Sequence, residues 1–174
     1  NKGGSGQLAA FCTRNEGIFT MSGDFDQRLE ELGLSRPDAP APAANYVPDV
    51  VVGNTVYGSG QISANAGGMI TGKVGADLTA EEGAKAAQAC ALALLAQAKK
   101  ACGGDISRLK RVVKLTGFVN STPEFGDQPK VINGASDLLV ALLGDAGRHA
   151  RSAVSAGALP FNVAVEIEGI FEIE

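Results

Sequence analysis

The segment HARSAVSAGALPFNVAVEIE, residues 149–168, holds the charged side chains with the clearest chemical potential in this sequence. Arg151 stands in a run of Ala, Ser and Val, and Glu166 and Glu168 stand in the apolar run that follows. A guanidinium can hold a carboxylate by two parallel hydrogen bonds, and a nearby glutamate can orient water or move a proton. If the two runs are paired strands, Arg151 and Glu166 lie near each other at the edge of a cleft. On spacing alone, a cross-strand ion pair with a structural role is favoured over a reactive site.

Other residues with reactive side chains are few. His149 is the single histidine, and we expect it at the rim of a site rather than in the chemistry. The three cysteines lack metal-ligand spacing, and Cys90 and Cys102 are expected to be small buried hydrophobes. Cys12 lies outside the expected domain. The sequence therefore predicts no metal site, and an odd number of thiols fits a reducing cytoplasm.

Composition limits the class of protein. The chain has 174 residues, of which 45% are hydrophobic and 20% charged, as expected for one globular domain. The net charge is −4 and the basic residues are scattered, so a nucleic-acid partner is disfavoured. No apolar stretch reaches the roughly 18 residues that span a bilayer, and residues 1–20 do not resemble a secretory signal. We expect no membrane partner.

The N-terminal part should precede the main domain. Met21 has the appearance of a natural start, so residues 1–20 are interpreted as a non-native leader. Residues 24–33 have the spacing of a short amphipathic helix that Gly33 ends. The proline-rich segment 35–49 is predicted to be an extended arm, because proline excludes both helix and central strand. We therefore divide the chain into a leader (1–20), a helix and arm (21–44) and a domain (45–174).

The domain shows alternating strand and helix patterns. Residues 50–61 read as a hairpin around Gly53 and Asn54, followed by a third strand at 69–74. Thr79 and Glu82 form a capping box that starts a long helix over about 80–102. A strand at 108–120 should place Val112 on its solvent face and Val113 on its core face. A second helix after Pro129 and two closing strands, 150–156 and 162–172, complete the order.

This order, βββαβαββ, is typical of an α+β domain with a mixed sheet and both helices on one face. The second face would carry many Val, Ile and Ala side chains without cover. Closed symmetric oligomers commonly cover such a face.

Four segments resemble the Rid/YjgF family of imine and enamine deaminases, whose members are also known as L-PSP endoribonuclease-like proteins. ARSAVSAGALPFNVAVEIE resembles the C-terminal signature, in which Arg-Ser is followed by Leu-Pro and an apolar run ending in Glu-(Ile/Met)-Glu. The others occur in the family's order: NYVPDVVVGNTVYGSGQ, VVKLTGFVNSTPEF and VINGASDLL. The similarity covers about residues 45–174. The departures, including Ala153 where the family often has Cys, indicate a divergent subgroup.

The resemblance implies a chorismate mutase-like fold, a homotrimer with clefts between subunits, and no metal or organic cofactor. It implies that Arg151 binds the carboxylate of a 2-imino acid and that Glu166 orients the attacking water, as in a 2-iminobutanoate/2-iminopropanoate deaminase. The products would be a 2-keto acid and ammonia. By position, the other substrate-binding residues are Tyr46, Ser59, Gly60 and Asn133.

Alternatives remain for the residues and for the function. Tyr46 could pack at an interface, Ser59 could be a hydrogen-bonded turn residue, and Asn133 could cap the second helix. A trimer that binds small carboxylates without turnover is the second function. An L-PSP-type endoribonuclease is the least favoured, because the chain is acidic and has one histidine.

Overall fold

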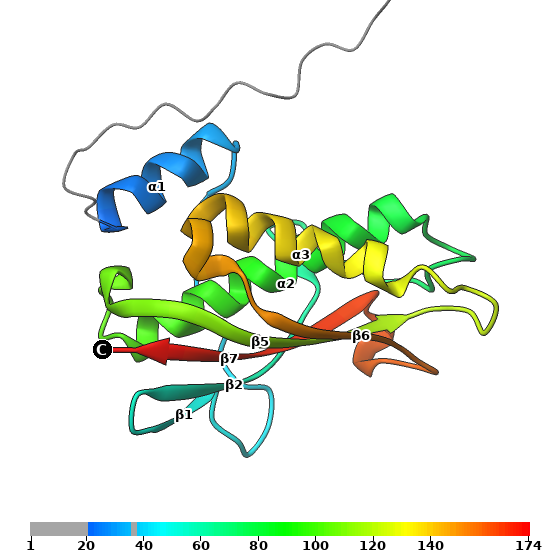
Figure 1. The fold of residues 1–174 in the computed structure, drawn as a ribbon. Coiled ribbons are helices and arrows are strands. Elements are labelled where there is room, and N and C mark those ends of the chain that lie inside the picture. Colours follow the sequence, from blue (N-terminus) through cyan, green and yellow to red (C-terminus); the bar gives the residue numbers. More distant parts are fainter. Residues whose placement is uncertain (1–20, 36–37) are drawn as a thin grey trace, which may run out of the picture.

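A five-stranded sheet carries the candidate site residues. The computed structural model describes residues 21–35 and 38–174, so the expectations for the leader 1–20 and Cys12 lie outside the described residues. The sheet order is β1-β2-β7-β5-β6, and all pairs are antiparallel except the parallel pair β5 and β6 (Figure 1). Its strands are β1 (Asp49–Val52), β2 (Thr55–Ile62), β5 (Leu109–Asn120), β6 (Ala150–Ala156) and β7 (Val165–Ile173).

Two long helices, α2 (Ala80–Ala101) and α3 (Gln128–Leu143), cover one face of this sheet (Figure 1). The predicted capping box starts α2: Thr79 Oγ1 accepts from the Glu82 amide, and the Glu82 carboxylate accepts from the Thr79 amide. Lys99 and Lys100 stand in its last turn, where cations suit the helix dipole. The fold class, the two main helices and the mixed sheet are confirmed.

Gly134 lets α2 and α3 pack closely, because a Cβ at this position would overlap the backbone carbonyl of Ala84. We expect Gly134→Ala to lower the free energy of unfolding by about 2 kcal/mol, since overpacking costs about 3 kcal/mol and alanine regains about 1 kcal/mol of helix propensity. Denaturant unfolding tests this. Gly126→Ala is the control, because a Cβ there meets nothing within 4 Å. Equal stability of the two variants would contradict the close helix contact.

The two faces of the sheet differ in cover. In β7, Val165, Ile167 and Phe171 point into the core beneath the helices, as predicted, while Glu166 and Glu168 point to the other face. No helix of the described chain covers that other face (Figure 1). Apolar side chains on it are accordingly exposed, among them Val50 (51%), Tyr57 (50%) and Val154 (45%).

Two strand predictions were wrong in detail. The strand expected at 69–74 does not join the sheet: β4 (Gly68–Met69) pairs only with β3 (Ala64–Asn65), and Gly68, Gly72 and Gly75 take positive φ that breaks extended pairing. In β5, Val112 is buried and Val113 exposed, the reverse of the prediction. Register irregularities at 109–111 and 112–114 shift the alternation of side chains there.

The N-terminal elements pack on the domain. Helix α1 (Met21–Glu31) lies against α3, with Phe25 and Leu29 buried and Arg28 donating to the Leu142 carbonyl at 2.8 Å (Figure 1). Among the described residues, no helix has the length and hydrophobicity to cross a membrane.

Candidate functional site

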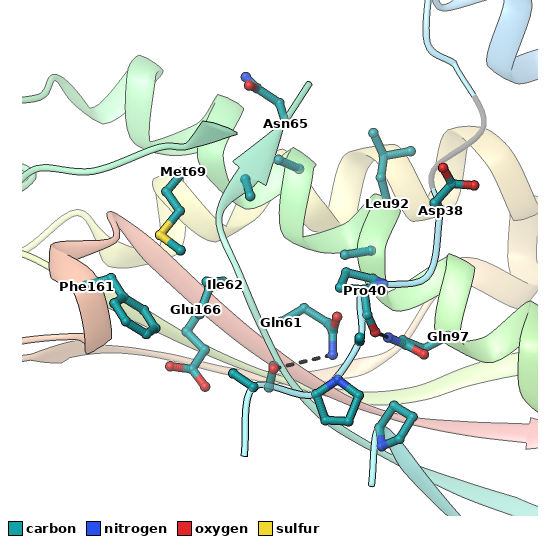
Figure 2. A pocket seen from close by; sticks show the side chains of 18 of the residues that line it. Asp38, Pro40, Gln61, Ile62, Asn65, Met69, Leu92, Gln97, Phe161 and Glu166 are labelled. Carbon is teal, nitrogen blue, oxygen red and sulfur yellow. Dashed lines mark hydrogen bonds between the residues drawn. The ribbon is translucent and has the colours of Figure 1, made fainter. Parts of the chain in front are cut away.

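Glu166 stands at the mouth of a cavity of about 780 Å³ beside the open edge of β2. Strand β1 pairs β2 only as far as Gly58, so the following stretch of β2 has no strand on its outer side. The arm residues 38–48, the β3–β4 hairpin and one face of α2 enclose this stretch (Figure 2). We call this hollow the glutamate cavity; its lining includes Tyr46, Gly60, Ile62, Ala93, Phe161 and Glu166.

A bulge in β2 makes room for the Glu166 carboxylate. Between Gly58 and Gln61 the strand has two residues, Ser59 and Gly60, opposite one residue of β7. A Cβ on Gly60 would overlap Oε1 of Glu166 and lie 3.0 Å from its carboxylate carbon. Glycine is therefore required here for the carboxylate to lie against the backbone.

The environment of Glu166 favours its protonated form. Partial burial, and secondarily the negative charge of Glu168, raise the pKa of the Glu166 carboxyl above its ordinary value. Among the described residues, no ion pair or hydrogen bond neutralises this carboxylate. A glutamate with a raised pKa can exchange a proton closer to neutral pH, as general acid–base chemistry requires.

Tyr46 and Ser59 have different places beside this cavity. Tyr46 is half exposed and lines it, with its hydroxyl 3.5 Å from the Ala43 amide. Ser59 holds the arm: its hydroxyl donates to the Val47 carbonyl at 2.7 Å and its amide to the Pro48 carbonyl at 2.8 Å. These hydrogen bonds agree with the structural alternative for Ser59, but the residue lies in the bulge of β2 and not in a turn.

Arg151 lies at the other end of the sheet, under α3. Its Nη1 donates to Oδ1 of Asn133 at 2.8 Å and to Oγ of Ser136 at 3.1 Å. Its Nη2 lies 3.4 Å from the carbonyl of Pro129. Asn133 is inside α3, which begins at Gln128, so the alternative that it caps the helix is wrong.

The Arg151 guanidinium keeps donors for a ligand. Its three partners are uncharged, and within the described chain no carboxylate forms an ion pair with it. A guanidinium has five N–H donors. The Nε donor and one Nη2 donor are unused by the described residues, and side by side they form the fork that binds a carboxylate bidentately. We call Arg151 with Asn133 and Ser136 the arginine edge.

His149 supports the arginine edge. Its Nδ1 lies 2.6 Å from the Gly147 carbonyl, which can only accept, so Nδ1 is the donor in this contact. Nε2 lies 2.9 Å from Ser136 Oγ, and the same hydroxyl oxygen accepts from Arg151 Nη1. His149 therefore orients Ser136, next to the site.

Within one chain, Arg151 and Glu166 do not meet, and the expectation that their strands pair was wrong. Strand β5 lies between β6 and β7: Arg151 pairs with Leu115, whereas Glu166 pairs with Phe118. Two strand spacings and three residues separate them, about 10 Å in each direction. Their register also sets them on opposite faces, with Arg151 toward the helices. A direct Arg151–Glu166 ion pair is therefore absent from the described chain.

Several residues of the site carried signals that sequence reasoning missed. Ser136 follows Asn133 by three residues, the spacing that puts both on one helix face. Phe161 follows the Leu-Pro turn directly and lines the glutamate cavity. The proline-rich composition of the arm predicts an extended chain but does not indicate which surface the arm packs against.

Cys90 and Cys102 are free and buried, as predicted. Burial, and then the charge of Glu166, raise the pKa of the Cys90 thiol, so it stays protonated beside the Val165 carbonyl. In the described residues, no group of three or more His, Cys, Asp or Glu side chains is arranged to hold a metal ion.

Comparison with known proteins identifies a matching family and several similar proteins. The family described as "YjgF/chorismate mutase-like, putative endoribonuclease" matches residues 26–171. Protein TCP17 of Trypanosoma cruzi is 49% identical over 154 residues, covering 87% of this chain and 96% of the relative. A 2-iminobutanoate/2-iminopropanoate deaminase of Dermatophagoides farinae is 32% identical over 143 residues, covering 81% and 95%. The crystal structure of Atu1372 from Agrobacterium tumefaciens, a protein of unknown function, superposes with a TM-score of 0.83 at 49% identity, covering 88% and 95%.

Proposed function

The chain belongs to the YjgF/chorismate mutase-like family, and we propose that it hydrolyses 2-imino or enamine acids at a site shared between two copies of a cyclic homotrimer. The deaminase among its relatives supports the reaction class. Free, buried Cys90 and Cys102 fit a reducing compartment, and we place the activity in the cytoplasm.

One observation carries the proposal: each half of the site lacks what the other half has. The glutamate cavity has an unneutralised carboxylate and no lining cation, and the arginine edge has unused guanidinium donors and no carboxylate. The two groups lie two strands apart and on opposite faces of the sheet, which supports a site that forms between chains. Head-to-tail contact of such halves closes into a ring of three when each copy is rotated by about 120°, and the uncovered sheet face would be buried in that ring.

Arg151 would bind the substrate carboxylate. Its Nε and Nη2 donors grip the two oxygens, while Nη1 is held by Asn133 and Ser136, so the fork is fixed before the ligand arrives. The C=N carbon next to this carboxylate then faces Glu166 of the neighbouring copy.

Glu166 would drive the addition of water. As a carboxylate it takes a proton from a water molecule while the oxygen forms a bond to the imine carbon, and the imine nitrogen takes a proton from solvent to give a carbinolamine. Glu166 then returns its proton to the amine nitrogen, the C–N bond breaks to release ammonia, and the hydroxyl proton of the carbinolamine passes to solvent as the ketone forms. The sum is one imine and one water converted to one ketone and one ammonia.

Mixed trimers test the shared site. Arg151→Ala and Glu166→Gln chains, each inactive alone, are co-expressed with different tags in equal amounts, and ammonia release from imines generated in situ is measured. In random rings, about one junction in four joins an intact Arg151 to an intact Glu166, so we expect about a quarter of wild-type activity. No recovery in verified mixed trimers would contradict the shared site. Tight keto-acid binding without any turnover by the wild type would instead favour the binding protein, and RNA cleavage lost in Arg151→Ala would favour the ribonuclease.

A further inference from the structure

The glutamate cavity is larger than a small imino acid needs. Its 780 Å³ falls in the upper part of the range of about 300–1,000 Å³ that is typical of sites for drug-sized ligands. An imino acid of three or four carbons is far smaller. The space beyond Glu166 is therefore available to the rest of a substrate.

The walls of this space are mainly apolar. Helix α2 contributes Ala89, Leu92 and Ala93, which the spacing of an α-helix places on one face. Pro40 and Pro42 of the arm also line this space. Ile62, Met69 and Phe161 surround the end near Glu166 (Figure 2). The charged side chains among the lining residues are Glu166 and the exposed Asp38, both acidic, so a second anionic group would be repelled.

The arm that forms the outer wall is fastened to the domain. Gln97 of α2, only 2% exposed, donates from Nε2 to the Pro40 carbonyl at 2.7 Å (Figure 2). Ser59 holds the other end through Val47 and Pro48. Proline limits the backbone freedom between these two anchors. The arm is therefore held in place as one wall of the cavity.

Phe161 is held in a costly conformation at the mouth of the cavity. The backbone φ angles of Phe161 and Asn162 are both 57°, in the left-handed region that residues other than glycine rarely adopt. Asn120 fixes this turn by donating to Asn162 Oδ1 at 3.1 Å and to the Val163 carbonyl at 3.2 Å. The result is an aromatic ring that is 65% exposed beside Glu166. Strained residues of this kind cluster at ligand sites.

From these features we propose that the preferred substrates are 2-imino acids with a large apolar side chain, branched aliphatic or aromatic, which the glutamate cavity holds between the arm, α2 and Phe161. This inference rests on the proposed function and deepens it. With the carboxylate on the neighbouring Arg151 and the reacting carbon beside Glu166, the side chain extends into the apolar space.

Substrate comparison is the first test. Imines are generated in situ by an amino acid oxidase from alanine, leucine, phenylalanine and arginine, and kcat/KM for ammonia release is measured with the intact protein. Burial of each extra methylene is worth about fourfold, and leucine has three more side-chain carbons than alanine, so we expect the leucine and phenylalanine imines to exceed the alanine imine by at least about 30-fold. Equal rates, or preference for the alanine or arginine imine, would overturn the inference while leaving the proposed reaction intact.

Variants that reshape the cavity are the second test. Ala93→Phe fills the α2 wall and should lower kcat/KM for the leucine imine about 30-fold, but for the alanine imine less than about threefold. Ala141→Phe, on the exposed surface of α3, is the matched control for the added ring. Should Ala93→Phe fail to fold, Gln97→Leu releases the arm and should raise KM for the leucine imine about 10-fold with little change in kcat, against Gln88→Leu as control. An equal effect of either cavity variant on both imines would contradict the proposal.

Binding separates the inference from the reaction. Calorimetric titration with pyruvate and 4-methyl-2-oxopentanoate, the keto acids that correspond to alanine and leucine, needs no turnover. At least about 10-fold tighter binding of the larger acid supports the inference even if no imine is hydrolysed, in which case the proposed reaction alone fails. Equal binding of the two acids, or binding of neither, overturns the inference.

Discussion

We expect the replacement of Arg151 with alanine to lower kcat/KM for imine hydrolysis by about a thousandfold. Loss of a buried, hydrogen-bonded charge pair costs about 4 kcal/mol, and every 1.4 kcal/mol corresponds to a factor of ten. The deficit should appear largely as weaker substrate binding, so 2-keto acids should bind at least about a hundredfold more weakly. Steady-state kinetics and calorimetric titration measure the two quantities.

Arg148→Ala is the matched control for Arg151→Ala. Arg148 is an exposed arginine three positions earlier, and its ion pair with Asp145 has an N–O distance of 3.3 Å. Exposed pairs contribute at most about 1 kcal/mol, so activity should change less than about twofold. Arg151→Lys keeps the charge but loses the two-pronged fork, and should recover only part of the activity. A folded Arg151→Ala variant with wild-type kcat/KM would exclude Arg151 as the carboxylate ligand.

The fold could be predicted from the sequence where local signals suffice. The capping box at Thr79 and Glu82 fixes the start of α2, and the alternation of apolar and polar residues around Glu166 fixes which face of β7 is buried. Strand partners are different, because they depend on contacts far apart in the chain. Strand β6 pairs with β5, in parallel, since α3 carries the chain back across the sheet in a βαβ unit.

The site could be predicted in two parts but not as a whole. Glu166, Gly60 and Tyr46 meet in one cavity, and Arg151 meets Asn133. Their distribution over two edges of the sheet depends on the strand order, which the sequence pattern does not contain. The arm lies over the cavity of its own chain, held by a glutamine whose role no pattern indicated.

Replacing Glu166 with glutamine should lower kcat by about a thousandfold while leaving 2-keto acid binding within about threefold. Glutamine has nearly the same shape, but it cannot take a proton from water, and general acid–base catalysis contributes about 10²–10⁴-fold. Separate measurement of kcat and of keto-acid affinity distinguishes this from the Arg151 effect. Retention of kcat would exclude Glu166 as the group that activates water.

The pH profile gives an independent check on Glu166. Because its carboxylate is the active form and its pKa is raised, kcat/KM should fall with decreasing pH at a value above the ordinary 4.5 of glutamate. The charge of Glu168 contributes to that rise, so Glu168→Gln should shift the acidic limb to lower pH. An acidic limb that stays in place in Glu168→Gln would contradict this coupling.

Glu166→Gln should also make the protein more stable near neutral pH, because the site holds a carboxylate where a neutral group is favoured. The pKa of Glu166 lies above 4.5 in the folded chain, so between pH 4.5 and that folded pKa the native state binds more protons than the unfolded chain. The free energy of unfolding therefore falls as the pH rises through this range, and above it the ionised side chain destabilises the fold. Glutamine carries no charge and avoids this loss. The gain in Tm over the wild type, measured at equal protomer concentration, should therefore disappear below pH 4.5, where both states of the wild type are protonated. A variant that loses turnover and gains stability in that pH-dependent way has lost a functional charge, whereas one that loses both has lost a structural contact.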